Sequence, residues 1–115
     1  MNRSMTISAK ELSALVSQGE GETIEFKRST GEMKEAMQTL CAFLNGMGGT
    51  VLFGVKPDGT IEGQEVSDQT LRDIAQAADR FEPPAHVSIH GVKVKAARDV
   101  IAVVVEGAGN AAVRV

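Results

Sequence analysis

The fold is decided by the stretch from Ala42 to Val55, which reads AFLNGMGGTVLFGV. Around and before its first glycine, apolar residues recur at helical spacing, namely Met33, Ala36, Met37, Leu40, Leu44 and Met47. After the glycines, the continuous apolar run from Thr50 to Val55 is rich in β-forming residues and predicts a buried strand. The stretch therefore predicts a helix that feeds a central strand, and the rest of the domain must pack around this junction.

Three glycines and an asparagine occupy the junction. We expect Gly46, Gly48 and Gly49 to supply the positive φ angles that end the helix and reverse the backbone. We expect Asn45 to hydrogen-bond the local backbone, so that Asn45, Gly48 and Gly49 form a structural turn. The order of helix, glycines and strand is the reverse of a phosphate-binding loop, and the sequence has no G-x-x-x-x-G-K-[ST] motif. We therefore do not expect ATP as a cofactor.

The sequence on either side of the junction predicts the remaining elements. These are a helix over 9–18, a strand over 20–28, a strand over 60–66, a helix over about 68–80, and strands over 86–95, 100–105 and 113–115. Capping boxes at Ser8–Glu11 and Ser29–Glu32 open the first helix and the helix before the glycines. Asp58-Gly59 closes a tight turn. The pattern predicts a single α+β domain over residues 1–115, with about three helices packed on one small mixed β-sheet.

Composition is that of an ordinary globular domain. Hydrophobic residues make up 43% of the 115 residues and charged residues 23%. No apolar run approaches the roughly 18 residues that a membrane span requires, and the N-terminus lacks a secretory pattern, so we expect a cytoplasmic protein without a membrane partner. The net charge of -3 does not favour nonspecific coating of nucleic acid, which depends on phosphate neutralisation. Any such binding must therefore come from local basic patches.

Two short segments are locally basic. One holds Lys27, Arg28 and Lys34, and the other holds Lys93, Lys95 and Arg98. The simplest interpretation is that these cations are solvated faces of amphipathic elements. The alternative is that they contact phosphates.

The strand around Glu25 has the most suggestive chemistry. Ile24 and Phe26 alternate with Glu25 and Lys27, so we expect the first pair in the core and the second pair on the opposite face, about 7 Å apart. A carboxylate and an ammonium group would then lie side by side. A cross-strand ion pair is the simplest interpretation of this arrangement.

The alternative is a metal-dependent hydrolytic site. Carboxylate oxygens hold Mg²⁺ or Mn²⁺, and a neighbouring lysine stabilises charge that develops on a phosphate. Under this hypothesis Glu20, Glu25 and Asp58 are the metal ligands, and Lys27 completes the catalytic set.

Four short motifs, in their order, resemble the AlbA-like domain of Schlafen-family proteins. They are Glu25-Phe26-Lys27, the helix end from Ala42 to Gly49, Gly54-Val55, and the segment from Asp58 to Gly63. This domain is also called a divergent AAA domain, and bacterial members are labelled RecG-related helicases or transcriptional regulators. The resemblance implies a domain that binds nucleic acid and forms the N-terminal module of a longer protein.

The resemblance also bears on cleavage. Schlafens that cleave RNA use two glutamates five positions apart, which match Glu20 and Glu25, and an aspartate just after the G-V of the central strand. Here Lys56-Pro57 follows that G-V, and the nearest acid is Asp58. The resemblance therefore favours binding over cleavage.

The leading hypothesis is a DNA- or RNA-binding domain of a bacterial transcriptional regulator, which needs no cofactor. The residues expected to contact phosphates are Lys27, Arg28, Lys93 and Lys95. One alternative is an endoribonuclease that depends on Mg²⁺ or Mn²⁺. Another is a protein-binding module in which open strand edges pair two copies as a homodimer.

Overall fold

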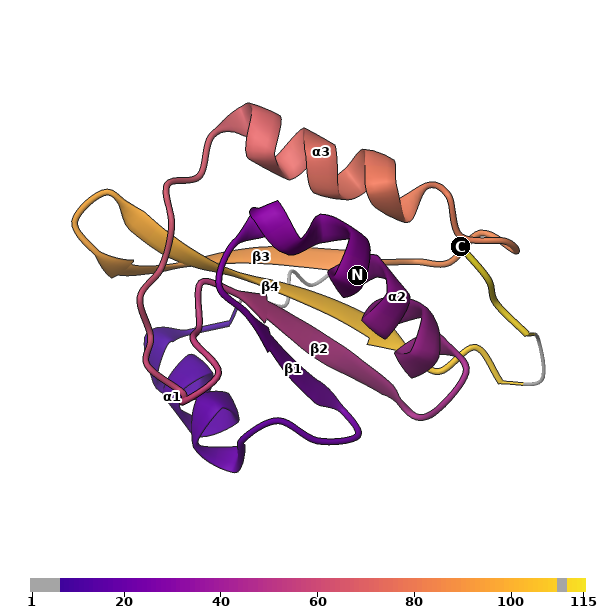
Figure 1. Cartoon of the computed structure of the whole chain (residues 1–115), viewed down its shortest axis with the longest axis horizontal. Coiled ribbons are helices and arrows are strands. Elements are labelled where there is room, and N and C mark those ends of the chain that lie inside the picture. The colour runs from indigo at the N-terminus through magenta and orange to yellow at the C-terminus, as the bar shows by residue number, and fades with distance from the viewer. Residues whose placement is uncertain (1–6, 110–111) are drawn as a thin grey trace, which may run out of the picture.

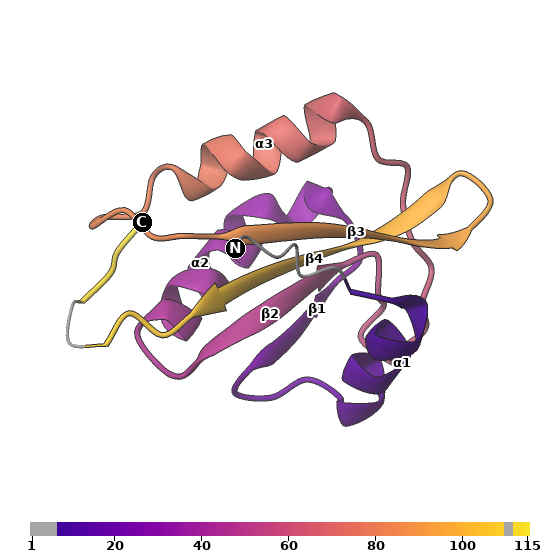
Figure 2. The ribbon, with the colours of Figure 1, turned by 180° about the vertical axis from the view of Figure 1, so that it is seen from behind.

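The computed structural model describes residues 7–109 and 112–115 and has a mixed sheet with helices on both faces (Figures 1 and 2). Its elements are α1 (Ala9–Gln18), β1 (Ile24–Lys27), the 3-10 helix η1 (Thr30–Glu32), α2 (Met33–Leu44), β2 (Gly48–Phe53), α3 (Asp68–Ala78), β3 (Ser88–Lys95) and β4 (Arg98–Glu106). The predicted α+β fold is confirmed. Within this part of the chain, the helices are too short and too polar to cross a membrane.

The helix before the glycines connects two parallel strands. β1 and β2 pair in parallel, with Lys27 opposite Phe53 near their carboxyl ends. β4 runs antiparallel to β2, and β3 runs antiparallel to β4, so the strand order is β1-β2-β4-β3. β1 and β3 are therefore the two edges of the sheet (Figure 1).

Each face of the sheet contributes to its own apolar cluster. On one face, α2 and α3 place Leu40 and Ile74 against Val51 of β2. On the other face, α1 places Leu12 in a cluster with Leu52. Because successive side chains of a strand point to opposite faces, a central strand must be apolar at every position. The continuous apolar runs in β2 and β4 thus reflect their interior places in the sheet.

The glycines of the junction are used differently from the prediction. β2 begins at Gly48 rather than Thr50, and only Gly48 has a positive φ, of 87°. Gly49 serves a close approach instead. A Cβ there would lie 2.6 Å from a ring carbon of Phe43 and 2.8 Å from the carbonyl oxygen of Thr23. The missing side chain thus allows the end of α2 to pack tightly on the strand that it feeds.

Asn45 acts at long range rather than within the turn. Its Nδ2 donates to the carbonyl oxygen of Val113 at 2.8 Å, and its Oδ1 accepts from the N–H of Val113 at 2.7 Å. The side chain therefore ties the C-terminal segment to the end of α2. The predicted strand over 113–115 is wrong, because Arg114 forms only an isolated bridge with Glu82.

The capping box at Ser8 is present, but the one predicted at Ser29 is wrong. The Ser29 hydroxyl accepts from the N–H of Gly31, and the Glu32 carboxylate accepts from the N–H of Arg28. The helical region begins as η1, and α2 starts only at Met33. Glu32 is thereby free to bind the backbone beyond β1.

Residues 60–66 do not form the predicted strand. They make two isolated bridges, Val55 with Ile61 and Gln64 with Asp99. The turn at Asp58-Gly59 is present, since the N–H of Gly59 donates to the carbonyl oxygen of Lys56 at 2.8 Å. The segment after this turn therefore leaves β2 and reaches the first residues of β4.

The close approach at Gly49 gives a direct test of the junction. Gly49→Ala should lower the free energy of unfolding by about 1–3 kcal/mol, because the new methyl group overpacks the contact with Phe43. Gly46→Ala is the matched control: its Cβ would come no closer than 3.5 Å to a neighbouring atom, and its effect should stay within about 0.5 kcal/mol. Urea denaturation of both variants measures the difference. Equal stability of the two would contradict the packing described for Gly49.

Candidate nucleic-acid interface

The sheet topology brings four strand ends to one end of the molecule. β1 and β2 finish there, β3 finishes at Lys95, and β4 begins at Arg98, the Cα partner of Lys95. Among the residues that the structure describes, six Lys and Arg residues lie within three positions of these four strand ends. We call them the basic end: Lys27, Arg28, Lys56, Lys93, Lys95 and Arg98. The two basic segments of the sequence thus lie at the same end of the sheet, at its two edge strands, whereas Lys34 lines a separate groove between α2 and α3.

Lys27 is mainly a structural member of the basic end. Its Nζ lies 3.5 Å from Glu25 Oε2, and the side chains are 13% and 30% exposed, respectively. Its carbonyl oxygen accepts from the N–H groups of Gly54 and Val55. The expected proximity of Glu25 and Lys27 is confirmed, although the pair lies within one strand. Most of the lysine side chain is covered.

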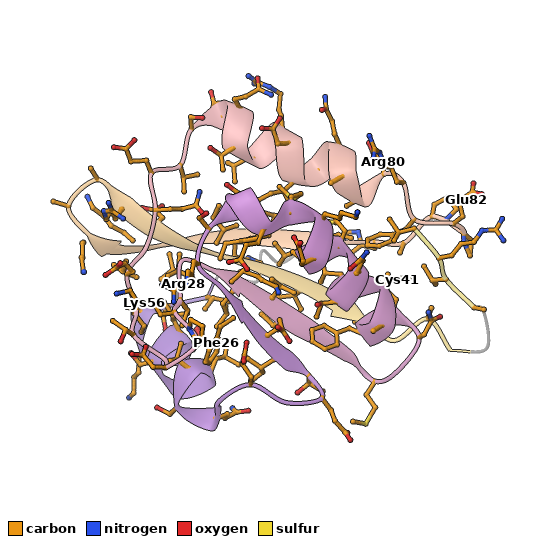
Figure 3. All side chains as sticks on the ribbon, viewed as in Figure 1. Phe26, Arg28, Cys41, Lys56, Arg80 and Glu82 are labelled. Atoms are coloured by element: carbon orange, nitrogen blue, oxygen red, sulfur yellow. The ribbon has the colours of Figure 1, made fainter. Side chains whose placement is uncertain are left out.

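Arg28 and Lys56 follow the carboxyl ends of the two parallel strands, at the same end of the molecule (Figure 3). Arg28 is exposed, and Lys56 lies 3.6 Å from the Glu62 carboxylate. In the turn after Lys56, Asp58 accepts a hydrogen bond from the N–H of Thr60 at 2.9 Å. That bond, with smaller contributions from the charges of Lys56 and Arg28, lowers the pKa of the Asp58 carboxyl. The region therefore holds carboxylates as well as cations.

The β3–β4 hairpin supplies the other half of the basic end. Lys93 is the Cα partner of Asp99, and the register shifts between Lys93 and Lys95. Both lysines are exposed. The Arg98 guanidinium donates to the carbonyl oxygen of Gly63 at 3.0 Å. The hairpin therefore offers two exposed ammonium groups and one anchored guanidinium group.

Gln64 holds the two halves together. Its Oε1 accepts from the N–H of Thr30 at 2.9 Å, and its Nε2 donates to the Thr30 hydroxyl at 3.1 Å. Its backbone exchanges two hydrogen bonds with Asp99, at 2.8 and 2.9 Å. One residue thus links the turn that follows Arg28 to the start of β4.

The three carboxylates proposed as metal ligands have separate local roles. Glu20 Oε1 accepts from the N–H of Phe26 at 2.8 Å, Glu25 pairs with Lys27, and Asp58 closes the turn at Thr60. In residues 7–109 and 112–115, the structure places no group of three or more His, Cys, Asp or Glu side chains where it would hold a metal ion. The geometry in hand therefore does not gather Glu20, Glu25 and Asp58 around a shared cation.

The sequence analysis did not predict a role at this site for two residues, Lys56 and Gln64. Lys56 was detectable in principle, because the carboxyl ends of parallel strands lie at the same edge of a sheet and Lys56 follows β2 as Arg28 follows β1. Gln64 gives no local signal, since its partners at Thr30 and Asp99 are distant in sequence.

Comparison with known proteins identifies a family. The family model described as "Schlafen, AlbA_2" matches residues 20–113, a range that contains every element from β1 to β4. The match confirms the resemblance drawn from the four motifs. No curated protein matches the chain.

The Glu20 hydrogen bond can be tested by stability. Glu20→Ala should lower the free energy of unfolding by about 1–3 kcal/mol, because the N–H of Phe26 loses its acceptor. Glu20→Gln retains an oxygen acceptor at the same distance from the backbone and should lose less. Urea denaturation in a buffer containing a chelator gives the comparison. If both variants match the wild type, Glu20 has no role in holding β1.

Proposed function

Because the chain belongs to the Schlafen AlbA_2 family, whose domains have nucleic-acid-related roles, we propose that it is a nucleic-acid-binding domain that contacts phosphates through the basic end. DNA and RNA are both phosphate polymers, and the proposed contacts are to the backbone rather than to bases. Such contacts fix the position of a protein on nucleic acid without reading sequence.

The observation that supports this proposal is that two basic segments lie at the same end of the sheet in a chain whose net charge is -3. Arg28 and Lys56 follow β1 and β2 on one side of the sheet, and Lys93 and Lys95 belong to the edge strand β3 on the other side. Lys95 and Arg98 are Cα partners, and like charges in such positions repel. A bound phosphate would relieve this repulsion.

The exposed cations are the better candidates for direct contact. Lys93, Lys95 and Arg28 are exposed, whereas Lys27 is paired with Glu25 and largely covered. We therefore assign Lys27 a supporting part, in which it fixes the end of β1 and adds to the local positive field.

Binding without cleavage fits the carboxylates of this region better than metal-dependent hydrolysis. Glu20 and Asp58 each accept a backbone hydrogen bond, and Glu25 is held by Lys27. Among the residues that the structure describes, these carboxylates are not gathered into a group of three or more potential metal ligands. In the cell, we propose that the domain delivers nucleic-acid contacts to a bacterial transcriptional regulator of the RecG-related type, in the cytoplasm.

Charge reversal tests the basic end. Arg28→Glu/Lys95→Glu should weaken binding to mixed-sequence duplex DNA or single-stranded RNA at least tenfold and lower the salt slope of log Kd by about two, because each variant residue removes one phosphate contact. Fluorescence anisotropy at several salt concentrations measures both quantities.

The matched control is Arg72→Glu/Arg80→Glu, which makes the same change in net charge on and just after α3. It should change binding far less than the first variant. Absence of binding to either nucleic acid at low salt would refute the proposal. An equal loss in both variants would exclude the basic end as the contact surface, and Mn²⁺-dependent cleavage that disappears in Glu25→Gln would favour the nuclease instead.

A further inference from the structure

The two edge strands, β1 and β3, differ in whether their outward-pointing backbone groups form hydrogen bonds. The carbonyl oxygens of Thr23, just before β1, and of Lys27, at its end, point toward β2. They accept from the N–H groups of Thr50 and Gly54, respectively. The alternation of a strand therefore points the groups of Ile24 and Phe26 outward. The N–H of Gly21 donates to the Ile24 carbonyl oxygen at 3.0 Å, and Glu20 accepts from the N–H of Phe26.

The next outward donor along the same edge is also occupied. The N–H of Arg28 donates to Glu32 Oε2 at 2.8 Å. Local side chains and a local turn therefore cover the edge of β1 along most of its length. Such covering prevents another strand from adding to an exposed edge.

The edge of β3 is different. Asp99 exchanges both backbone hydrogen bonds with Gln64, on the β2 side of β4. By alternation, Val100 and Ala102 point their backbone groups toward β3, at Val92 and His90. The outward backbone groups of β3 are therefore those of Ile89, Gly91 and Lys93. Among the described residues, no hydrogen bond reaches these outward groups.

We propose that β3 is a self-association edge, where a second copy of this chain adds its own β3 in antiparallel orientation to form one continuous sheet. The bound copy supplies the donors and acceptors that the outward backbone lacks. An antiparallel pair that keeps equivalent faces together and is centred on Gly91 places Gly91 opposite Gly91, and Lys93 opposite Ile89.

The single open edge of β3 selects this orientation. Its other edge is bonded to β4, so two copies that keep equivalent faces on the same side can join β3 to β3 only in antiparallel orientation. The antiparallel pair brings Lys93 to the hollow beneath α3, which Ile89, Val87 and Asp79 line. The aliphatic stem of the lysine can cover the half-buried apolar side chains while its ammonium group faces Asp79.

Association should stop at two copies. A two-fold contact uses the same edge of both partners and is closed. The remaining edges of the joined sheet are both β1, whose outward groups are occupied. The proposal concerns the chain without nucleic acid, so its failure would leave the basic end untouched.

The mass of the chain in solution tests the proposal. Sedimentation equilibrium from low micromolar to millimolar concentration should show a rise from 12.1 kDa toward twice that mass and no further. Gly91→Pro should weaken association about tenfold or more, because the central N–H of each copy is lost. Gly91→Ala retains the N–H, and its Cβ would lie 3.4 Å from the nearest atom, Asp99 Oδ2, so it should associate like the wild type.

Hydrogen exchange of the wild type provides a test that needs no variant. The amides of Ile89, Gly91 and Lys93 should be protected at high concentration and exchange rapidly on dilution, whereas those of His90 and Val92 should stay protected throughout. A monomeric mass at every concentration would overturn the proposal. So would a dimer that forms equally well in folded Gly91→Pro, or one whose outward β3 amides exchange rapidly.

Discussion

The structure depends on the parallel pairing of β1 with β2, because this pairing requires the chain to cross over the sheet between the two strands. α2 makes that crossing, and parallel strands need such a connection. The crossing ends in a short turn where Phe43 packs over Gly49 and the backbone of Thr23 lies against the same position. There is no room for a side chain at Gly49. This tight connection places β2 in the interior of the sheet, with β1 on one side and β4 on the other.

The parallel pairing also determines where charge accumulates. Two parallel strands end on the same side, and the antiparallel hairpin of β3 and β4 turns on that side as well. Residues 54–66 run between these ends, and Gln64 bonds to both. A chain with an excess of acidic residues can therefore present cations at one end. The carboxylates among them hold the backbone in place, as Glu32 does at Arg28.

Local patterns in the sequence were sufficient for most helices and strands. The capping box at Ser8, the alternation around Phe26 and the apolar run of β2 each report an environment that neighbouring residues determine. Long-range roles were not predictable in this way. Asn45 looked like a turn residue because its partner, Val113, is distant in sequence, and Glu20 looked like a metal ligand because a carboxylate that covers a strand edge leaves no distinct pattern. The basic segments were visible in the sequence, but their place at one end of the sheet depends on the strand order and directions.

We propose that residues from both basic segments form one surface for a phosphate polymer. Titration of the labelled chain with a short oligonucleotide, followed by backbone amide NMR, tests this directly. If one phosphate polymer binds both segments, the amide shifts of residues 27–29, 56–59 and 93–98 should change together, with one common affinity. Changes confined to a single segment, or centred on α3, would contradict it.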